Sequence, residues 1–527
     1  MPTFTVVSNT QSGNFQSDGV YMTKLPVASA AQSGPPTNQV VVIGSGSWGK
    51  RNTPLFFSDE KSGGAAIGIR TDLVKSALRE ALSGMPECTQ FMAILVDDGT
   101  STLATMTLMD TATPTPAALI NGTAVCPGTD ANSASIVATL QSGTLTNAPV
   151  LSITRFWIDG SAQTWNNIVG YSAANGPFVA ATFQTNALAA LNGTASGQVP
   201  DPYFVYTAGS SATTPQVGVA FAASGGTNGD SGVTDTTLVG TVTGSTLKGM
   251  QAATGLIWGS QLVLADFTTA ALFAAVAQFA NVEGADGWST FASGTDYITA
   301  IANKTSNTMS DDNMNVIMDW AYVFDKYQKA QILVSPLGKA AGIVASLDPF
   351  AYPGNKPQDG AEGISSTERL AKGAIGISER GQRESNNINW LDYDNGKWVL
   401  AHGLTSAGRQ INEIRAQKYI MYRAGQIAKL YQGGDVESTV PFAQADENDA
   451  RKQLYTALLG LQTELQGKVS SMGIILNDSN NSPASLAAGF LNFELDVTTR
   501  AGVQYIIGAT KVGNAVKVTA PPLPLAA

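Results

Sequence analysis

The spacing of apolar residues over the first hundred positions predicts a strand, a loop, a helix and a second strand. Residues 39–43 and 91–96 are short runs rich in apolar side chains, which are typical of strands buried on both faces. Between them, residues 72–82 carry apolar side chains at helical spacing, with Asp72 placed as the N-cap and Gly84 just after the end. Strands that alternate with helices indicate an α/β fold.

A different pattern covers residues 97–224. Thr, Ala, Ser, Gly and Pro dominate there, and Arg155 is the only basic residue. Short β-type runs at 150–157 and 202–206 alternate with turn-rich segments. The pattern predicts a mostly β domain inserted into the α/β part, and the cluster 225–230 (Gly-Gly-Thr-Asn-Gly-Asp) marks where the insertion ends.

Helical spacing returns after the insertion. Asp311 and Asp312 are interpreted as the start of a helix, where carboxylates offset the helix dipole. Helices are predicted around 247–255, 268–279, 311–327, 406–431 and 449–468, the last with Leu454, Leu458, Leu461 and Leu465 on one face. Strands are predicted at 3–7, 261–264, 331–335, 489–497, 503–508 and 516–518.

Composition and charge narrow the possible functions. The 527 residues are 13% charged, against about 25% in a typical soluble domain, and their net charge of −10 argues against nucleic acid as a partner. The longest apolar stretch, near 270–280, is shorter than the ~20 residues that span a membrane, so no membrane contact is expected. Residues 1–10 lack a basic segment before an apolar run, which predicts no secretory signal and synthesis in the cytosol. Cys88 and Cys126 are too few for a disulfide framework or a zinc site.

The glycine-rich segment 44–50 (Gly-Ser-Gly-Ser-Trp-Gly-Lys) follows a strand and resembles a nucleotide-binding loop. A dinucleotide site needs a helix that begins at the loop, and we expect no helix before Asp72. A phosphate loop needs a hydroxyl residue after the lysine, where Arg51 stands. We therefore interpret the segment as a surface turn.

The remaining candidates for chemistry also have structural interpretations. His402 is the only histidine, with no matched nucleophile in the sequence, and is interpreted as structural. The segment 478–482 begins like a calcium loop, but Pro483 stands where the loop needs glycine and the final glutamate is missing. We expect no catalytic residue, no cofactor and no metal.

The predicted helix 406–431 carries basic residues in an otherwise acidic protein. An ordinary solvated face and a face directed at an acidic partner both fit this spacing. The basic positions are Arg415, Lys418, Arg423 and Lys429, and the apolar stripe is Ile420, Ala424, Ile427 and Tyr431.

Short β-type segments also occur near both ends of the sequence. Each can pair inside its own domain, or it can add to the sheet edge of a neighbouring subunit through main-chain hydrogen bonds. The candidate arm residues are Phe4, Val6, Val503, Tyr505, Ile507, Val516 and Val518.

The order of these features resembles the contractile tail sheath family of bacteriophages and related injection machines. Leu404 stands where the family usually has an arginine. The matching segments are 40–54, Gly84 with 91–96, 225–230, 334–345 (Val-Ser-Pro-Leu-Gly-Lys-Ala-Ala-Gly-Ile-Val-Ala), 353–357, 387–391, 397–405, 411–415, 489–497 and 503–507.

The resemblance implies an α/β (α+β) multi-domain fold, with a discontinuous sheath core and an inserted, mostly β domain that protrudes. It implies a structural subunit of a phage tail, not an enzyme, assembled in the host cytoplasm into rings around the tail tube. The implied partners are copies of itself, the tail tube protein, and the baseplate and tail terminator proteins. A self-assembling adhesin or surface-layer protein is the alternative. Arg415, Lys418, Arg423 and Lys429 become candidate tube contacts.

The same resemblance divides the chain into an arm, a core, an insertion and a second arm. The ranges are 1–24 for the N-terminal arm, 25–96 and 225–330 for the α/β core, 97–224 for the insertion, 331–507 for the C-terminal core facing the tube, and 508–527 for the C-terminal arm.

Overall fold

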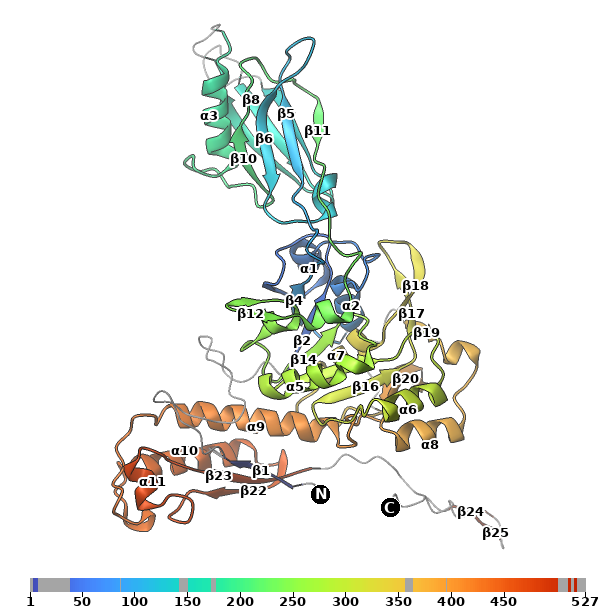
Figure 1. Ribbon diagram of the computed structural model, residues 1–527, viewed down its shortest axis with the longest axis vertical. Helices are drawn as coiled ribbons and strands as arrows, with labels where there is room; N and C mark the ends of the chain where they lie inside the picture. Colours follow the sequence, from blue (N-terminus) through green and yellow to red (C-terminus); the bar gives the residue numbers. More distant parts are fainter. Residues whose placement is uncertain are drawn as a thin grey trace.

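The protein has three parts stacked along its long axis, as Figure 1 shows: an inserted β domain, a central α/β domain, and a C-terminal part built on the long helix α9 (Ile411–Lys429). The expected mixed α/β multi-domain class is confirmed. The computed structural model describes residues 3–7, 38–85, 87–141, 150–171, 177–355, 364–394, 396–500, 510–512 and 516–518.

An eight-stranded sheet forms the central domain, in the order β21-β20-β16-β15-β14-β2-β4-β3. The six inner strands run parallel, and the two edge strands are antiparallel to their neighbours. Strands β2 and β16 are buried at every position, as expected where helices cover both faces of a parallel sheet. The strands are β2 (Gln39–Gly44), β3 (Pro54–Phe57), β4 (Gln90–Leu95), β14 (Gln261–Leu264), β15 (Asp286–Thr290), β16 (Met314–Met318), β20 (Asn389–Asp394) and β21 (Lys397–Ala401).

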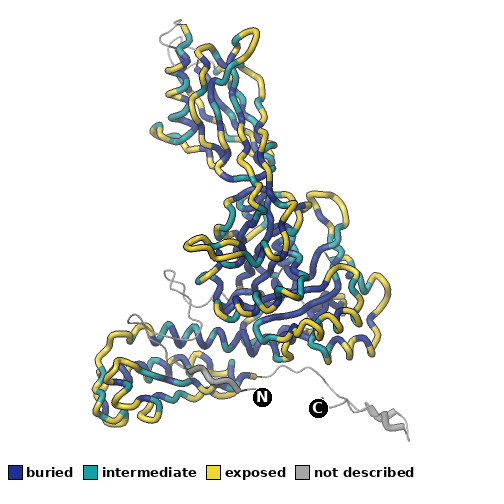
Figure 2. The backbone as a smooth tube through the Cα atoms, viewed as in Figure 1, coloured by how far each residue is buried: buried dark blue, intermediate teal, exposed yellow. Residues whose placement is uncertain are grey.

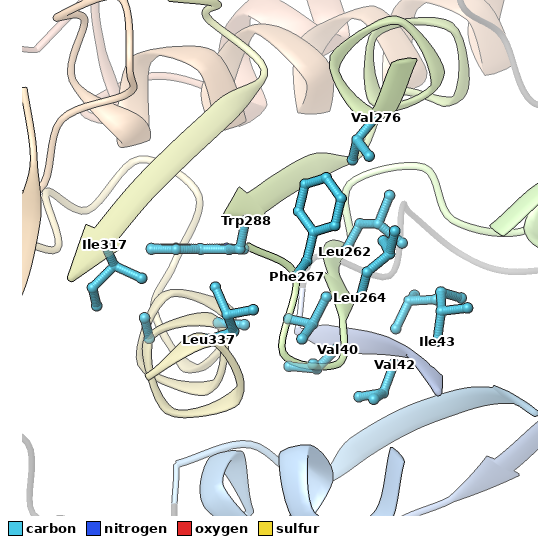
Figure 3. Close-up of a cluster of buried hydrophobic side chains, with 14 of the residues drawn as sticks. Val40, Val42, Ile43, Leu262, Leu264, Phe267, Val276, Trp288, Ile317 and Leu337 are labelled. Atoms are coloured by element: carbon cyan, nitrogen blue, oxygen red, sulfur yellow. The ribbon is translucent and has the colours of Figure 1, made fainter. Parts of the chain in front are cut away.

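Helices cover the two faces of this sheet. Figure 3 shows the apolar residues of β2 and β14 between Val276, on α5 (Phe273–Glu283), and Leu337, on α7 (Leu337–Ser346). Phe267 and Trp288 are fully buried in the same core. The other helices of the central domain are α1 (Glu60–Ile67), α2 (Ala77–Gly84), α4 (Asp235–Val239), α6 (Tyr297–Ser306) and α8 (Ile377–Ser385).

Three glycines let helices α2 and α7 pack closely. A Cβ atom on Gly338 would lie 2.0 Å from the Glu80 carbonyl oxygen, and one on Gly342 would lie 2.6 Å from that of Gly84. A Cβ on Gly84 would in turn lie 2.6 Å from the Gly338 oxygen. The Glu80 carboxylate accepts a hydrogen bond of 2.9 Å from the Gly338 amide in the first turn of α7. The glycine spacing of the 334–345 segment is therefore a packing requirement.

The inserted domain has a core of its own, with Phe183, Trp165 and Phe204 fully buried. Helix α3 (Ala180–Leu191) packs beside β9 and β10, although the sequence pattern predicted only strands around it. One sheet has the order β10-β6-β5 and the other β11-β7-β8-β9. The strands are β5 (Thr105–Met109), β6 (Ala118–Ala124), β7 (Ser135–Gln141), β8 (Val150–Phe156), β9 (Ala162–Val169), β10 (Phe204–Ala208) and β11 (Ala220–Ala222).

The C-terminal part packs α9 against α10 (Ala450–Glu464) and a three-stranded sheet. The predicted apolar face of Leu454, Leu458, Leu461 and Leu465 is confirmed, and it packs in one cluster with Ile420 and Ala424 of α9. The sheet order is β1-β23-β22. The elements are β1 (Thr3–Val7), β22 (Val469–Ile475), α11 (Pro483–Ala487) and β23 (Glu494–Thr499), followed by β24 (Thr510–Val512) and β25 (Val516–Val518).

Two smaller sheets flank the central domain. They are the hairpin β12 (Val242–Thr243) with β13 (Thr246–Leu247), and the sheet β18-β17-β19, formed by β17 (Ala321–Asp325), β18 (Ala330–Val334) and β19 (Ile364–Thr367). Because α7, β20 and β21 belong to the central domain, that domain extends well into the range 331–507 that the sequence assigned to the C-terminal core.

The helix predicted at 311–327 is wrong. These residues form β16 and β17, separated by a turn in which Asp319 has φ +71. All five residues of β16 are buried in the middle of the sheet, and a short apolar run of this kind fits a helix as well as a buried strand. Asp311 and Asp312 therefore precede a strand instead of starting a helix.

The first helix also lies elsewhere than predicted. Helix α1 begins at Glu60, where Asp59 and Ser62 form a capping box. The helix predicted at 72–82 is α2, and its N-cap is Ser76, not Asp72. The predicted strand at 503–508 lies outside the described residues.

Candidate assembly surfaces

Helix α9 docks on the central sheet at the amino-terminal ends of its inner strands, through a buried ion pair. The Lys418 ammonium group donates to the Asp286 carboxylate and, at 2.6 Å, to the Ala285 carbonyl oxygen. Gln261 donates to the other Asp286 oxygen at 3.0 Å. The side chains of Lys418 and Asp286 are each 3% exposed. Lys418 therefore holds the C-terminal part on the sheet and does not face solvent.

The other three basic residues of α9 have different surroundings. Arg415 is buried and donates to the Leu347 carbonyl oxygen at 3.0 Å, and burial lowers the pKa of its guanidinium to about 10. Arg423 is partly exposed and pairs with Glu464 of α10 at 2.8 Å. Lys429 is exposed at the end of the helix. Neither a solvated basic face nor a contact with the tube fits Arg415 and Lys418, because both lie in the interior.

The N-terminal strand pairs inside its own chain. Strand β1 runs antiparallel to β23, with Phe4 opposite Val497 and Val6 opposite Leu495. The pairing places β23 in the middle of the sheet and β1 and β22 at its edges. Among the strands that the structure describes, neither β1 nor β22 has a partner on its outer side. Open edges of this kind can accept a strand from another chain.

The remaining arm candidates lie near the C-terminus. Val516 and Val518 belong to β25, which pairs only with β24 among the described strands. An isolated two-stranded hairpin is marginally stable in water. Val503, Tyr505 and Ile507 lie outside the described residues.

The glycine-rich segment 44–50 is not a surface turn. Residues 44–49 are buried at the carboxyl end of β2, next to β14, where an open parallel sheet usually binds ligands. At this end of β2 the Lys75 carbonyl oxygen accepts from the Ser45 amide at 2.9 Å. The Lys75 ammonium group pairs with Asp235 and donates to the Asp266 carbonyl oxygen at 3.1 Å. The Ser45 amide and the Lys75 ammonium group, which could otherwise bind a phosphate, are thus already engaged within the chain.

The structure gives His402 a structural environment. The residue is 7% exposed, its ring stacks on Trp390 with ring centroids 6.4 Å apart, and burial lowers the pKa of its imidazole to about 4. Within the described ranges, no three His, Cys, Asp or Glu side chains gather in a way that could hold a metal ion. None of the described helices is both long and apolar enough to cross a membrane.

The sequence did not predict that the polar residues Gln261 and Asp286 contact α9. Gln261 and Asp286 are the first residues of the buried strands β14 and β15. A polar residue at the start of an apolar run indicates the end of a buried strand. The sequence does not show which distant basic side chain will pair with it. Trp48 was missed as well, because the loop around it was assigned to the surface.

Comparisons with known proteins identify the fold. No protein-family model and no curated protein sequence matches this chain. A sheath tail protein from Desulfitobacterium hafniense superimposes with a TM-score of 0.53 at 12% sequence identity, over 87% of this chain and 93% of its own. A sheath tail protein from Listeria innocua gives a TM-score of 0.49 at 13% identity, over 86% and 90% of the two chains.

The sheath complex of an extracellular contractile injection system, PVC, in its contracted state gives a TM-score of 0.35 at 13% identity, over 43% of this chain and 64% of its own. The first of the three structures shows that this chain has the fold of a sheath tail protein. The sequence resemblance is confirmed at the level of the fold.

Proposed function

We propose that the chain is the sheath subunit of a contractile tail, which polymerises as stacked rings around a tail tube and shortens to drive the tube through a target envelope. The fold shared with the Desulfitobacterium hafniense sheath tail protein over nearly the full length of both chains carries this proposal. In a phage, the subunit belongs to the virion tail and assembles in the host cytoplasm. The baseplate and tail terminator proteins are the proposed partners at the two ends of the assembled sheath.

The terminal strands are the proposed links between subunits. Residues 8–38 separate β1 from β2, and 31 extended residues reach up to ~100 Å at about 3.3 Å each. Strand β1 can therefore pair with β23 of a neighbour through the same main-chain hydrogen bonds that it makes within its own chain. The hairpin β24–β25 is the matching candidate at the C-terminal arm, where it would pair with an open edge of the sheet β1-β23-β22.

Arg423 and Lys429 are the proposed contacts with an acidic tail tube, because they are the accessible members of the basic set on α9. Exposed ion pairs contribute about 0–1 kcal/mol each. Contacts of that strength can be made in every ring of the extended sheath and lost during contraction.

A pair of cysteines across β1 and β23 tests the strand exchange. Thr5 and Asp496 are opposite each other, and Asp496 is exposed. Opposed residues in an antiparallel pair have Cα atoms about 4.5–5.5 Å apart, within the range of a disulfide. The T5C/D496C protein is oxidised before and after polymerisation and run on a non-reducing gel, with T5C alone as the control.

Exchange predicts a ladder of covalent oligomers from the polymer and a single-chain disulfide from the unassembled protein. A polymer that contains only single-chain disulfides would rule out exchange at β1 and leave the sheath role standing. Failure of the unmodified protein to polymerise at all would count against the sheath role itself.

A further inference from the structure

The inserted domain is joined to the central domain by a narrow neck, visible in Figure 1. Two chain segments form the covalent part of this neck. They pair with each other where the Asp98 amide donates to the Gly229 carbonyl oxygen at 2.8 Å and where Thr102 bridges Thr227. Two paired segments alone form a two-stranded ribbon, which can bend out of the plane of its strands. Figure 2 nevertheless shows buried residues through the neck.

Trp48, in the loop after β2, supplies a third attachment. The residue is 4% exposed and belongs to the core of the inserted domain, although it comes from the central domain. The ring meets that of Trp157 edge-on at 4.9 Å between centroids and that of Tyr203 at 5.6 Å. Trp157 and Tyr203 stack at 3.9 Å, and the Arg155 guanidinium lies 4.6 Å from the Tyr203 ring. Aromatic contacts of this kind combine a large buried area with a defined geometry.

Polar groups fix the same loop to the neck. The Asp130 carboxylate accepts from the Ile69 amide at 2.9 Å, and the Asp130 amide donates to the Ser47 carbonyl oxygen at 3.2 Å. Arg51 donates to the carbonyl oxygens of Gly46, at 3.0 Å, and Asn228, at 3.1 Å. The loop is thereby bonded to the inserted domain at Asp130 and to the returning segment of the neck at Asn228.

The inserted domain and the loop are in close backbone contact at Gly128 and Ser47. A Cβ atom on Gly128, which has φ +144, would lie 2.0 Å from the Ser47 carbonyl oxygen. The backbone of the inserted domain therefore touches the loop directly at this point. Only glycine allows such an approach.

We propose that residues 44–51 form a coupling element that locks the orientation of the inserted domain on the central sheet. The two covalent segments and the non-covalent attachment at Trp48 join the domains at three points. Because the third point lies beside the ribbon of the other two, the neck cannot bend as a simple hinge. The inserted domain then turns with the central domain as one body. This inference goes beyond the proposed sheath role and is tested on the unassembled chain, so the failure of one does not entail the failure of the other.

The test measures the distance between spin labels on the two domains by electron–electron double resonance. Ala181 on α3 and Ala302 on α6 are both exposed, and the labels are attached to A181C and A302C. The native Cys88 and Cys126 are buried, so they are poor labelling sites. Trp48→Ala removes the aromatic attachment, and Arg51→Met removes the hydrogen bonds from Arg51 to Gly46 and Asn228. Phe156→Ala is the matched control, because Phe156 is an aromatic residue of the inserted domain that is 40% exposed.

We expect a narrow distance distribution in the parent and the control, and a distribution at least twofold broader in Trp48→Ala. Near-ultraviolet circular dichroism checks that the inserted domain stays folded. If Trp48→Ala loses that signal, Arg51→Met decides, with broadening again expected. Folded variants whose distributions are as narrow as the parent's would overturn the proposal.

Discussion

The buried ion pair between Lys418 and Asp286 gives the sharpest prediction of stability. Lys418→Met keeps most of the side-chain length and removes the charge. The Asp286 carboxylate is then left in the interior with Gln261 as its remaining side-chain donor. Removing one partner of a buried pair costs about 3–5 kcal/mol, because the other charge stays unpaired and desolvated.

The matched control is Arg423→Met on the same helix. Arg423 and Glu464 are 29% and 32% exposed, so solvent already screens their interaction. Such pairs contribute about 0–1 kcal/mol. Two substitutions of the same type, less than two turns apart on one helix, are therefore expected to differ several-fold in their cost.

Hydrogen exchange of the α9 amides is the suitable assay, because a chain with several domains has no single free energy of unfolding. A loss of about 3 kcal/mol in the free energy of local opening makes the amides exchange roughly 100-fold faster. The double variant Lys418→Met with Asp286→Asn removes the stranded charge and is expected to recover part of the loss. If Lys418→Met exchanges no faster than Arg423→Met, the role assigned to this pair in docking α9 is refuted.

Three further predictions follow from the packing and from one buried histidine. Gly338→Ala is expected to lower the melting temperature of the central domain, because the added Cβ would lie 2.0 Å from the Glu80 oxygen, whereas Gly381→Ala on α8, where nothing lies nearby, is the control. Leu458→Ala is expected to destabilise the α9–α10 cluster by about 2–5 kcal/mol, measured by hydrogen exchange of the α10 amides, since Leu458 is fully buried. His402→Asn removes a group whose folded pKa, about 4, lies below the usual 6.5, so the native histidine costs stability as pH falls below 6.5. Between pH 6.5 and 5 the wild type should lose roughly 1–2 kcal/mol more stability than the variant. Asparagine accepts the positive φ at this position. Parallel curves of stability against pH for the two proteins would contradict this.

Strands and helices with a strong local pattern could be predicted from the sequence. The runs at β2, β4 and β14 are apolar and short, and the stripe of leucines on α10 has helical spacing. The pattern failed at β16, because a fully buried strand has no alternation to distinguish it from a buried helix.

The role of the basic residues on α9 could not be predicted, because it depends on long-range partners. Lys418 meets a carboxylate 132 residues away in the sequence. A helix with cations along one side looks the same whether that side faces solvent or a polar sheet edge. The loop around Trp48 was misassigned for a similar reason, since its glycines suit a turn and equally suit close packing.

Electron microscopy of the purified full-length protein tests the central claim most directly. A sheath subunit is expected to form hollow cylinders of stacked rings, with a lumen wide enough to surround a tube. A protein that stays monomeric across the accessible range of concentration and ionic strength, or that forms flat sheets instead of cylinders, would contradict the proposed function.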